Sequence, residues 1–163
     1  MNMGNNLKKY KELTSKDINI KKIDDLRATV GWHKRRSNEK WKEILSKSSF
    51  VYTVWDDDKL IGMGRILEDG IMCMFYDIVV DKNYQGEGIG KLIMENLLNQ
   101  VKDKEYTSIG LFASDENLDF LIPFYGKFGF ELVKGGMECK KYMKTGNPGG
   151  NNIIETDRNA SLK

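Results

Sequence analysis

The sequence contains very few of the residues that bind metals or form disulfides. It has one histidine, His33, and two cysteines, Cys73 and Cys139, which lie far apart in the chain. Two separated cysteines make neither a disulfide framework nor a metal-ligand spacing. We therefore expect no metal site and a reducing, cytoplasmic environment.

Long apolar runs are also missing, and the charge is close to balanced. No stretch approaches the roughly 20 apolar residues of a membrane span, and the N-terminus has no apolar segment typical of a secretory signal. The net charge is +2, but residues 1–50 carry 13 Lys and Arg against 6 Asp and Glu. That basic third suits a phosphate-bearing ligand or nucleic acid, or simply helix faces in solvent. Because no zinc-finger or RNA-binding signature accompanies it, we expect neither a nucleic-acid nor a membrane partner.

The remaining pattern is that of one soluble α/β domain. The chain has 163 residues, of which 40% are apolar and 31% charged, which suits a single globular domain. We expect a polar extension over residues 1–9, a domain over 10–143 and a Gly/Asn-rich tail over 144–163. Apolar spacing predicts strands over residues 10–15, 50–55, 59–67, 71–80, 106–114 and 137–143. It predicts helices over residues 17–30, 38–48, 89–101 and 115–130, the last interrupted or restarted at Pro123.

Three glycines at alternate positions, Gly86, Gly88 and Gly90, stand where a strand leads into a helix. The first N–H groups of a helix have no intrahelical partner, and with the helix dipole they form an anion site. Glycines leave those groups open to a phosphate, so the stretch predicts a pyrophosphate cradle, although a tight turn alone would also use them. A Walker A loop is excluded because Leu92 follows Gly90 and Lys91, and a dinucleotide fingerprint would require glycine at Lys91.

The pattern that fits is Q-x-x-G-x-G over residues 85–90, followed by "FYGKFGF" over residues 124–130. With these two blocks in this order, residues 10–143 resemble the GNAT superfamily of acyl-CoA-dependent N-acetyltransferases. The resemblance implies an α/β fold with a mixed, mostly antiparallel twisted sheet of six to seven strands and about four helices on its faces. It also implies an N-acetyltransferase that uses acetyl-CoA as co-substrate.

The resemblance further implies which residues bind acetyl-CoA. The glycine loop would bind the pyrophosphate, the strand before it would pair with the pantetheine arm, and an N–H of Val79 or Val80 would polarise the thioester carbonyl. Phe124 and Lys127 would flank the cofactor, although Phe124 suits core packing equally well. The expected cofactor-binding residues are Ile78, Val79, Val80, Gln85, Gly86, Glu87, Gly88, Ile89, Gly90, Lys91, Phe124 and Lys127.

Two titratable residues are candidates for proton transfer. The resemblance implies that Tyr125 protonates the departing thiolate, whereas an aromatic cluster would use it only for packing. Asp77 interrupts an apolar run, where an acid needs a partner or a purpose. It would take the proton of the amine directly or through water, hold a cationic substrate, or be structural. An acetyl-cysteine route lacks a base beside Cys73, so we expect direct transfer in a ternary complex.

The acceptor is expected under the loop that joins the first two helices. We expect Trp32, His33 and Arg36 to bind it, and the wider candidates are Arg35, Met63, Arg65 and Glu68. Arg35 and Arg36 suit an acceptor with an anionic group, whereas Asp77 and Glu68 suit a cationic acceptor. The sequence does not decide between these two kinds of acceptor. The predicted function is acetyl transfer to a primary amine of a small molecule. The alternatives are a non-catalytic acyl-CoA-binding regulatory domain and a protein lysine or N-terminal acetyltransferase, and a homodimer is left open.

Overall fold

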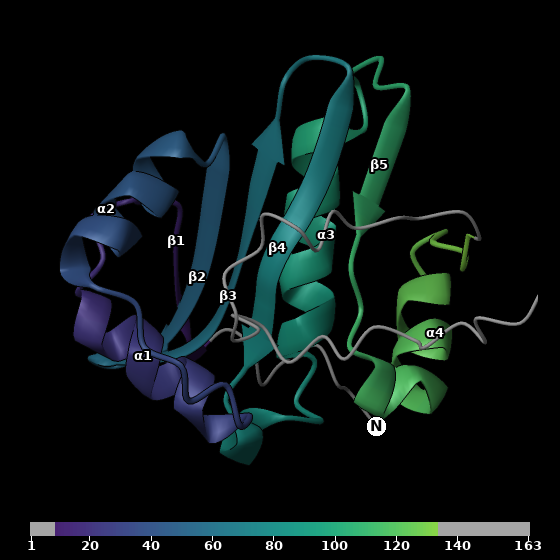
Figure 1. The fold of residues 1–163 in the computed structure, drawn as a ribbon. Coiled ribbons are helices and arrows are strands. Elements are labelled where there is room, and N and C mark those ends of the chain that lie inside the picture. Colours follow the sequence, from purple (N-terminus) through teal and green to yellow (C-terminus); the bar gives the residue numbers. More distant parts are fainter. Residues whose placement is uncertain (1–8, 134–163) are drawn as a thin grey trace, which may run out of the picture. The chain divides into compact units, whose positions relative to one another are not determined.

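The expected alternation of strands and helices is present in the computed structural model, which describes residues 9–133 (Figure 1). The strands are β1 Lys11–Leu13, β2 Phe50–Asp56, β3 Lys59–Glu68, β4 Met72–Val80 and β5 Ser108–Leu111. The helices are α1 Ile20–Thr29, α2 Asn38–Lys47, α3 Ile89–Val101 and α4 Leu118–Gly126. Of the predicted elements, only the last strand, residues 137–143, lies outside the described residues, as does the tail.

The strands form one sheet in the order β1-β2-β3-β4-β5. The first three pairings are antiparallel and the last, between β4 and β5, is parallel. The prediction of a mixed, mostly antiparallel sheet is therefore confirmed. The described residues contribute five strands, so the expected count of six to seven is not confirmed.

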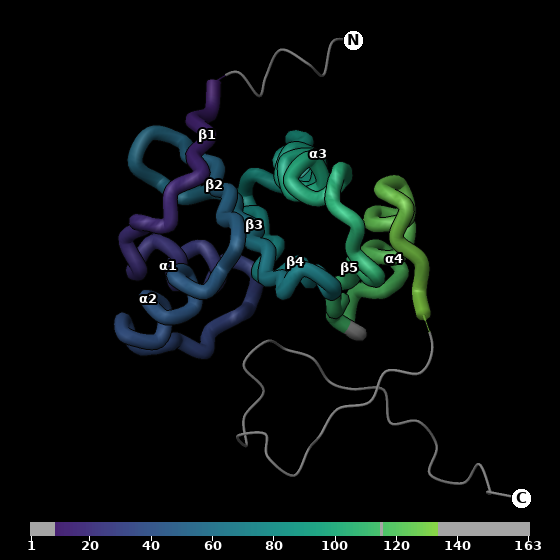
Figure 2. Tube along the Cα trace, turned by 90° about the horizontal axis from the view of Figure 1, so that it is seen from above, coloured from purple at the N-terminus to yellow at the C-terminus, as the bar shows by residue number. Residues whose placement is uncertain are grey.

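Helices cover both faces of this sheet, with α1 and α2 on one face and α3 on the other (Figure 2). Asn19 accepts a hydrogen bond from the Lys21 N–H and starts α1, and Ser37 accepts one from the Lys40 N–H and starts α2, which are ordinary side-chain caps. The core below these helices is apolar and closely packed. Its buried members include Ile23, Leu26, Trp41, Val51, Met63 and Val79.

On the other face, two glycines of β3 allow α3 to lie very close to the sheet. A Cβ on Gly62 would meet Ile89 Cγ2 at 2.9 Å, and a Cβ on Gly64 would meet Ile93 Cγ2 at 2.7 Å. Side chains at either position would push the helix outward, because such distances are shorter than van der Waals contact. The "GMG" sequence of β3 thus sets how closely α3 approaches the sheet.

The chain divides after Phe112 into two compact units. The first holds the whole sheet and α1 to α3. In the second, a 3-10 turn over Asp115–Asn117 leads into α4, which contains Pro123 without a break. The predicted interruption at Pro123 is therefore wrong, since one missing N–H is tolerated in this helix. None of the described helices has the length and apolar character to cross a membrane.

Candidate functional site

The glycine loop leads directly into α3, so that Gly90 already lies in the first turn of the helix. Gly86 and Gly88 have φ angles of +83° and +88°, a left-handed region that favours glycine. Gly88 is the residue before the first turn of α3, and no side chain caps that helix end. A Cβ on Gly86 would meet no atom within 4 Å. The N-terminus of α3 thus presents backbone N–H groups beside an open glycine surface, which suits an anion.

The strand that leads into this loop is bulged and separates from its neighbour. On the β3 side, Met63 pairs with Val79 and Arg65 with Tyr76, so a register shift lies between these pairs. Within the bulge Asp77 has a φ of +48°, which is uncommon for a residue other than glycine. On the β5 side, pairing ends at Phe75 opposite Leu111. Within residues 9–112, the β5-facing edge of residues 76–80 therefore has no strand partner.

Asp77 is held at this bulge by Arg65. The Arg65 Nε lies 2.6 Å from the Asp77 Oδ2, and the two side chains are only 12% and 10% exposed. The guanidinium also lies 4.8 Å from the Tyr76 ring centroid and 3.4 Å from the Ser48 hydroxyl. The acid that the sequence singled out is therefore charge-paired, a partnership for which nothing in the sequence pattern gives a signal.

An arginine and tryptophan cluster lies where the acceptor was expected. The Arg36 guanidinium lies 4.8 Å from the Trp41 ring centroid. That of the buried Arg27 lies 5.7 Å and 5.6 Å from the ring centroids of Trp32 and Trp41. Burial, with the neighbouring Arg36, lowers the pKa of Arg27, while Asp77 and Asp24 act in the opposite direction. The structure thus brings Trp32 and Arg36 together, and sequence reasoning missed Arg27.

Other acceptor candidates do not join this cluster. The side chain of His33 is exposed, as is that of Arg35. Met63 is fully buried in the core, so it is unavailable to a substrate. Glu68 accepts a hydrogen bond from the Gly70 N–H in the β3–β4 turn, at the far end of the strands from Asp77.

The second unit carries the other sequence block. Tyr125 belongs to an aromatic cluster on α4, with its ring centroid 5.1 Å from that of Phe124 and 6.1 Å from that of Phe130. Desolvation raises the pKa of Tyr125 to about 12, so its hydroxyl is protonated at neutral pH. Lys127, the residue after the helix, is exposed.

Three contacts tie the glycine loop to the N-terminal half of the chain. The Tyr10 hydroxyl donates to Glu87 Oε2 at 2.6 Å, and the Tyr84 hydroxyl donates to Asp56 Oδ2 at 2.8 Å. The Lys59 Nζ lies 2.9 Å from Oδ2 of Asp81, which is fully buried. Their partners are far apart in sequence, so the sequence pattern gave no signal for them.

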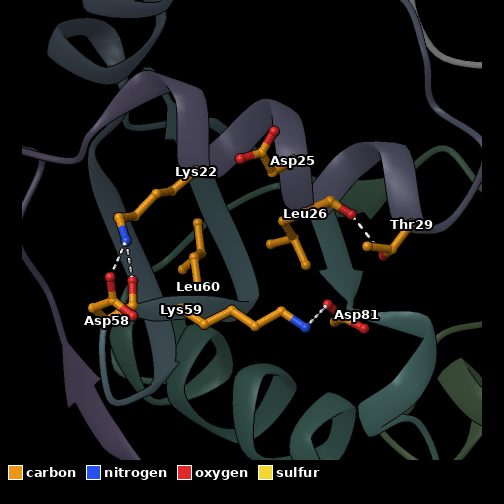
Figure 3. A pocket seen from close by; sticks show the side chains of 8 residues that line it. All are labelled: Lys22, Asp25, Leu26, Thr29, Asp58, Lys59, Leu60 and Asp81. Carbon is orange, nitrogen blue, oxygen red and sulfur yellow. Dashed lines mark hydrogen bonds and ion pairs between the residues drawn. The ribbon is translucent and has the colours of Figure 1, made fainter.

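A half-open cavity of about 280 Å³ lies between α1 and the β2–β3 hairpin (Figure 3). Two ion pairs cross it, Lys22 with Asp58 and Lys59 with Asp81. Of the residues predicted to bind cofactor or acceptor, none lines it. The residues that line it are Lys22, Asp25, Leu26, Thr29, Asp58, Lys59, Leu60 and Asp81.

Metal and thiol chemistry have little support in the described residues. Within residues 9–133, no three His, Cys, Asp or Glu side chains are grouped to hold a metal ion. Cys73 is buried, and this burial raises the pKa of its thiol to about 11, away from the reactive thiolate. Cys139 lies outside the described residues.

Comparison with known proteins gives a consistent result. A family model described as "Acetyltransferase (GNAT) domain" matches residues 14–143. The "Uncharacterized N-acetyltransferase ycf52" of Pyropia yezoensis is 32% identical over 122 residues, 72% of this chain and 67% of that protein. The "GCN5-related N-acetyltransferase 2, chloroplastic" of Arabidopsis thaliana is 35% identical over 143 residues, which cover 75% of this chain and 54% of that protein.

Solved structures agree in fold. A Staphylococcus aureus protein of unknown function, described as a probable acetyltransferase, shares 32% identity with a TM-score of 0.68, covering 80% of this chain and 98% of that one. A GNAT family acetyltransferase from Elizabethkingia anophelis, solved with acetyl-CoA bound, has a TM-score of 0.59 at 18% identity, covering 77% of this chain and 78% of that one. The second likeness concerns the fold alone.

Proposed function

Because the chain belongs to the GNAT acetyltransferase family, we propose that it moves the acetyl group of acetyl-CoA to a primary amine of a small molecule. The transfer is direct, within a ternary complex of enzyme, acetyl-CoA and amine. GNAT acetyltransferases use acetyl-CoA, so the donor follows from the family, whereas the acceptor class is our proposal.

The main support for this proposal is that β4 has an unpaired edge just before the chain enters the glycine loop. Strand pairing with β5 stops at Phe75, while β4 continues to Val80 and the loop reaches the uncapped end of α3 at Gly88. An extended amide-containing arm can pair with such an edge as an added strand. Its phosphate end then meets the N–H groups of α3.

The hydrogen bonds at the end of β4 indicate which N–H groups face this edge. The Asp81 N–H donates to the Ile61 carbonyl of β3. Successive residues of a strand point their N–H and C=O groups to opposite edges, so Val80 faces away from β3 and Val79 toward it. The Val80 carbonyl accepts from the Gln85 side chain at 3.2 Å, which agrees with this direction.

This alternation favours Val80 over Val79 as a partner for the pantetheine arm. Ile78 lies two residues earlier and shares the same edge. Since the pyrophosphate occupies the loop beyond Val80, the thioester lies toward the bulge. We therefore assign the stabilisation of the tetrahedral oxyanion to the Ile78 N–H, the nearer of the two to the bulge.

Proton transfer is assigned to Asp77 and Tyr125. The attacking amine must lose its proton, and Asp77 at the bulge accepts it, directly or through a water. Tyr125, whose pKa is raised to about 12 by desolvation, gives a proton to the departing thiolate. Direct attack by the amine is favoured because the raised pKa of buried Cys73 leaves little thiolate for a covalent intermediate.

The acceptor is assigned to Trp32 and Arg36, and the buried Arg27 and Trp41 contact these two side chains and position them. Aromatic faces and guanidinium groups suit an amine attached to a ring or to an anionic group. His33 and Lys127, both exposed, stay predictions for the acceptor and cofactor sites.

A panel of arylalkylamines, aminosugars and lysine peptides, scored by release of the coenzyme A thiol, tests the proposal. We expect turnover with small amines. Turnover with peptides alone would instead indicate a protein acetyltransferase. Tight binding of acetyl-CoA without turnover of any amine would favour a regulatory acyl-CoA-binding domain.

Cellular location and oligomeric state are two further parts of the proposal. We propose a cytoplasmic enzyme, while the name of the Arabidopsis thaliana relative places that protein in the chloroplast. A homodimer is tested by the mass of the protein in solution.

A further inference from the structure

We propose that Tyr10 is a positioning residue for acetyl-CoA. Its hydroxyl holds the Glu87 side chain, and with it the glycine loop, in the conformation that receives the pyrophosphate. This inference rests on the proposed function of that loop. It concerns a residue that precedes the first strand and lies 77 positions before its partner.

The contact is short, sheltered and charge-assisted. The Tyr10 hydroxyl lies 2.6 Å from Glu87 Oε2, and the tyrosine is only 6% exposed. The Lys9 Nζ lies 3.6 Å from the same oxygen. The Tyr10 ring packs edge-on against Tyr84, in the turn just before the glycines, with ring centroids 6.0 Å apart. Tyr10 therefore contacts the loop through its hydroxyl and the turn before it through its ring.

The loop needs such a partner because of where Glu87 stands. It is the one acidic residue of the stretch 85–91, and it lies between Gly86 and Gly88, which both have positive φ. Glycines leave the backbone free to move, and an unheld carboxylate here would repel a pyrophosphate. The Lys9 ammonium offsets the charge of this carboxylate, and the hydrogen bond from Tyr10 fixes its direction.

The rest of the loop is anchored separately. Asp81 is paired with Lys59, and Tyr84 is hydrogen-bonded to Asp56. These contacts hold the segment before the glycines, whereas Tyr10 holds a residue between them. Tyr10 itself is fixed by β1, which starts at the next residue and pairs Lys11 with Trp55 of β2.

The experiment compares Tyr10→Phe with the wild type using two acetyl donors. Acetyl-CoA carries the pyrophosphate, and S-acetylpantetheine lacks it. The dissociation constant of acetyl-CoA is measured by calorimetry, and KM is measured for both donors. We expect Tyr10→Phe to weaken acetyl-CoA binding about tenfold, since a hydrogen bond to a charged group is lost, and to leave the KM for S-acetylpantetheine at its wild-type value.

Two further variants make the test specific. Tyr106→Phe removes a tyrosine hydroxyl that has no hydrogen-bond partner among the described residues, and it should leave acetyl-CoA binding unchanged. Adding Glu87→Gln to Tyr10→Phe removes the repelling charge and should restore most of the lost affinity.

Three results would overturn the proposal. They are unchanged acetyl-CoA binding in Tyr10→Phe, an equal rise in KM for both donors, and no recovery on adding Glu87→Gln. Failure of the wild type to bind acetyl-CoA at all would instead remove the proposed function, and this inference with it.

Discussion

Arg65 and Asp77 face each other across β3 and β4, with Nε and Oδ2 2.6 Å apart, at the point where β4 leaves its regular register. The pair fixes an aspartate whose φ is +48°. It also holds the carboxylate beside Ile78, in the part of β4 that has no pairing with β5. Asp77 therefore combines an ion pair with an uncommon backbone conformation.

Asp77→Asn tests the assignment of Asp77 as proton acceptor. Asparagine tolerates the left-handed conformation and can still accept a hydrogen bond from Arg65, but it cannot take a proton. We expect kcat to fall by about 10²-fold. The melting temperature should fall less than in Asp77→Ala, because asparagine keeps the hydrogen bond from Arg65 but leaves this largely buried guanidinium without its counter-charge.

Asp77→Ala is the companion variant, because it removes both the proton acceptor and the Arg65 contact. This variant should have a lower kcat and also a lower melting temperature than the wild type. Wild-type kcat in Asp77→Asn, with a loss only in Asp77→Ala, would limit Asp77 to holding the bulge. A raised KM for the amine at normal kcat would instead assign it to substrate binding.

Gly88→Val tests the pyrophosphate site. Valine disfavours the φ of +88° found there and places a side chain before the N-terminus of α3, so acetyl-CoA binding should be largely lost. Gly70→Val is the matched control, because Gly70 has a φ of +89° and open space around it in the β3–β4 turn. Calorimetric titration of both variants with acetyl-CoA gives the answer. Equal affinities would contradict the site.

Tyr125→Phe tests the general acid. The side chain keeps its packing against Phe124 and loses only the proton, so kcat should fall by about 10²–10⁴-fold with acetyl-CoA affinity unchanged. Because the pKa of Tyr125 is raised to about 12, the phenol is protonated at lower pH and deprotonates only above that value. The wild-type rate should therefore show no alkaline decline from Tyr125 below about pH 10. A kcat equal to that of the wild type would return Tyr125 to a packing role.

Gly64→Ala tests the close approach of α3 to the sheet. Its Cβ would lie 2.7 Å from Ile93 Cγ2, so the Ile93 side chain or the helix must shift, at a cost of about 1–3 kcal/mol in the free energy of unfolding. In Gly110→Ala, also in a strand, the new atom would meet only the flexible Met74 side chain, 3.3 Å away at Sδ. Urea unfolding of the two variants should show a clearly larger loss for Gly64→Ala, and similar losses would argue against tight packing at β3.

The sequence predicted local features of this fold well. The helix over residues 89–101 agrees with α3 at Ile89–Val101, because its apolar spacing and glycine start are contained in the segment itself.

Features that depend on register or on distant partners were not predictable. The contact of Arg65 with Asp77 depends on a bulge that changes which residues face each other, and side-chain alternation gives no signal for such a shift. The hydrogen bond from Tyr10 to Glu87 joins the residue before the first strand to the loop after the fourth. The interruption expected at Pro123 was wrong. Proline lacks one backbone N–H, but α4 continues through it from Leu118 to Gly126.

The glycines of β3 have a consequence for the length of ligand that the enzyme accepts. The pantetheine arm of acetyl-CoA is flexible but of limited length, so in the proposed binding mode the distance between the first turn of α3 and the bulge in β4 must lie within its reach. Gly62 and Gly64 set the height of α3 above the strands by having no side chains. In the proposed binding mode, the spacing of the two ends of the donor site thus depends on how closely α3 packs on β3, which these two glycines allow.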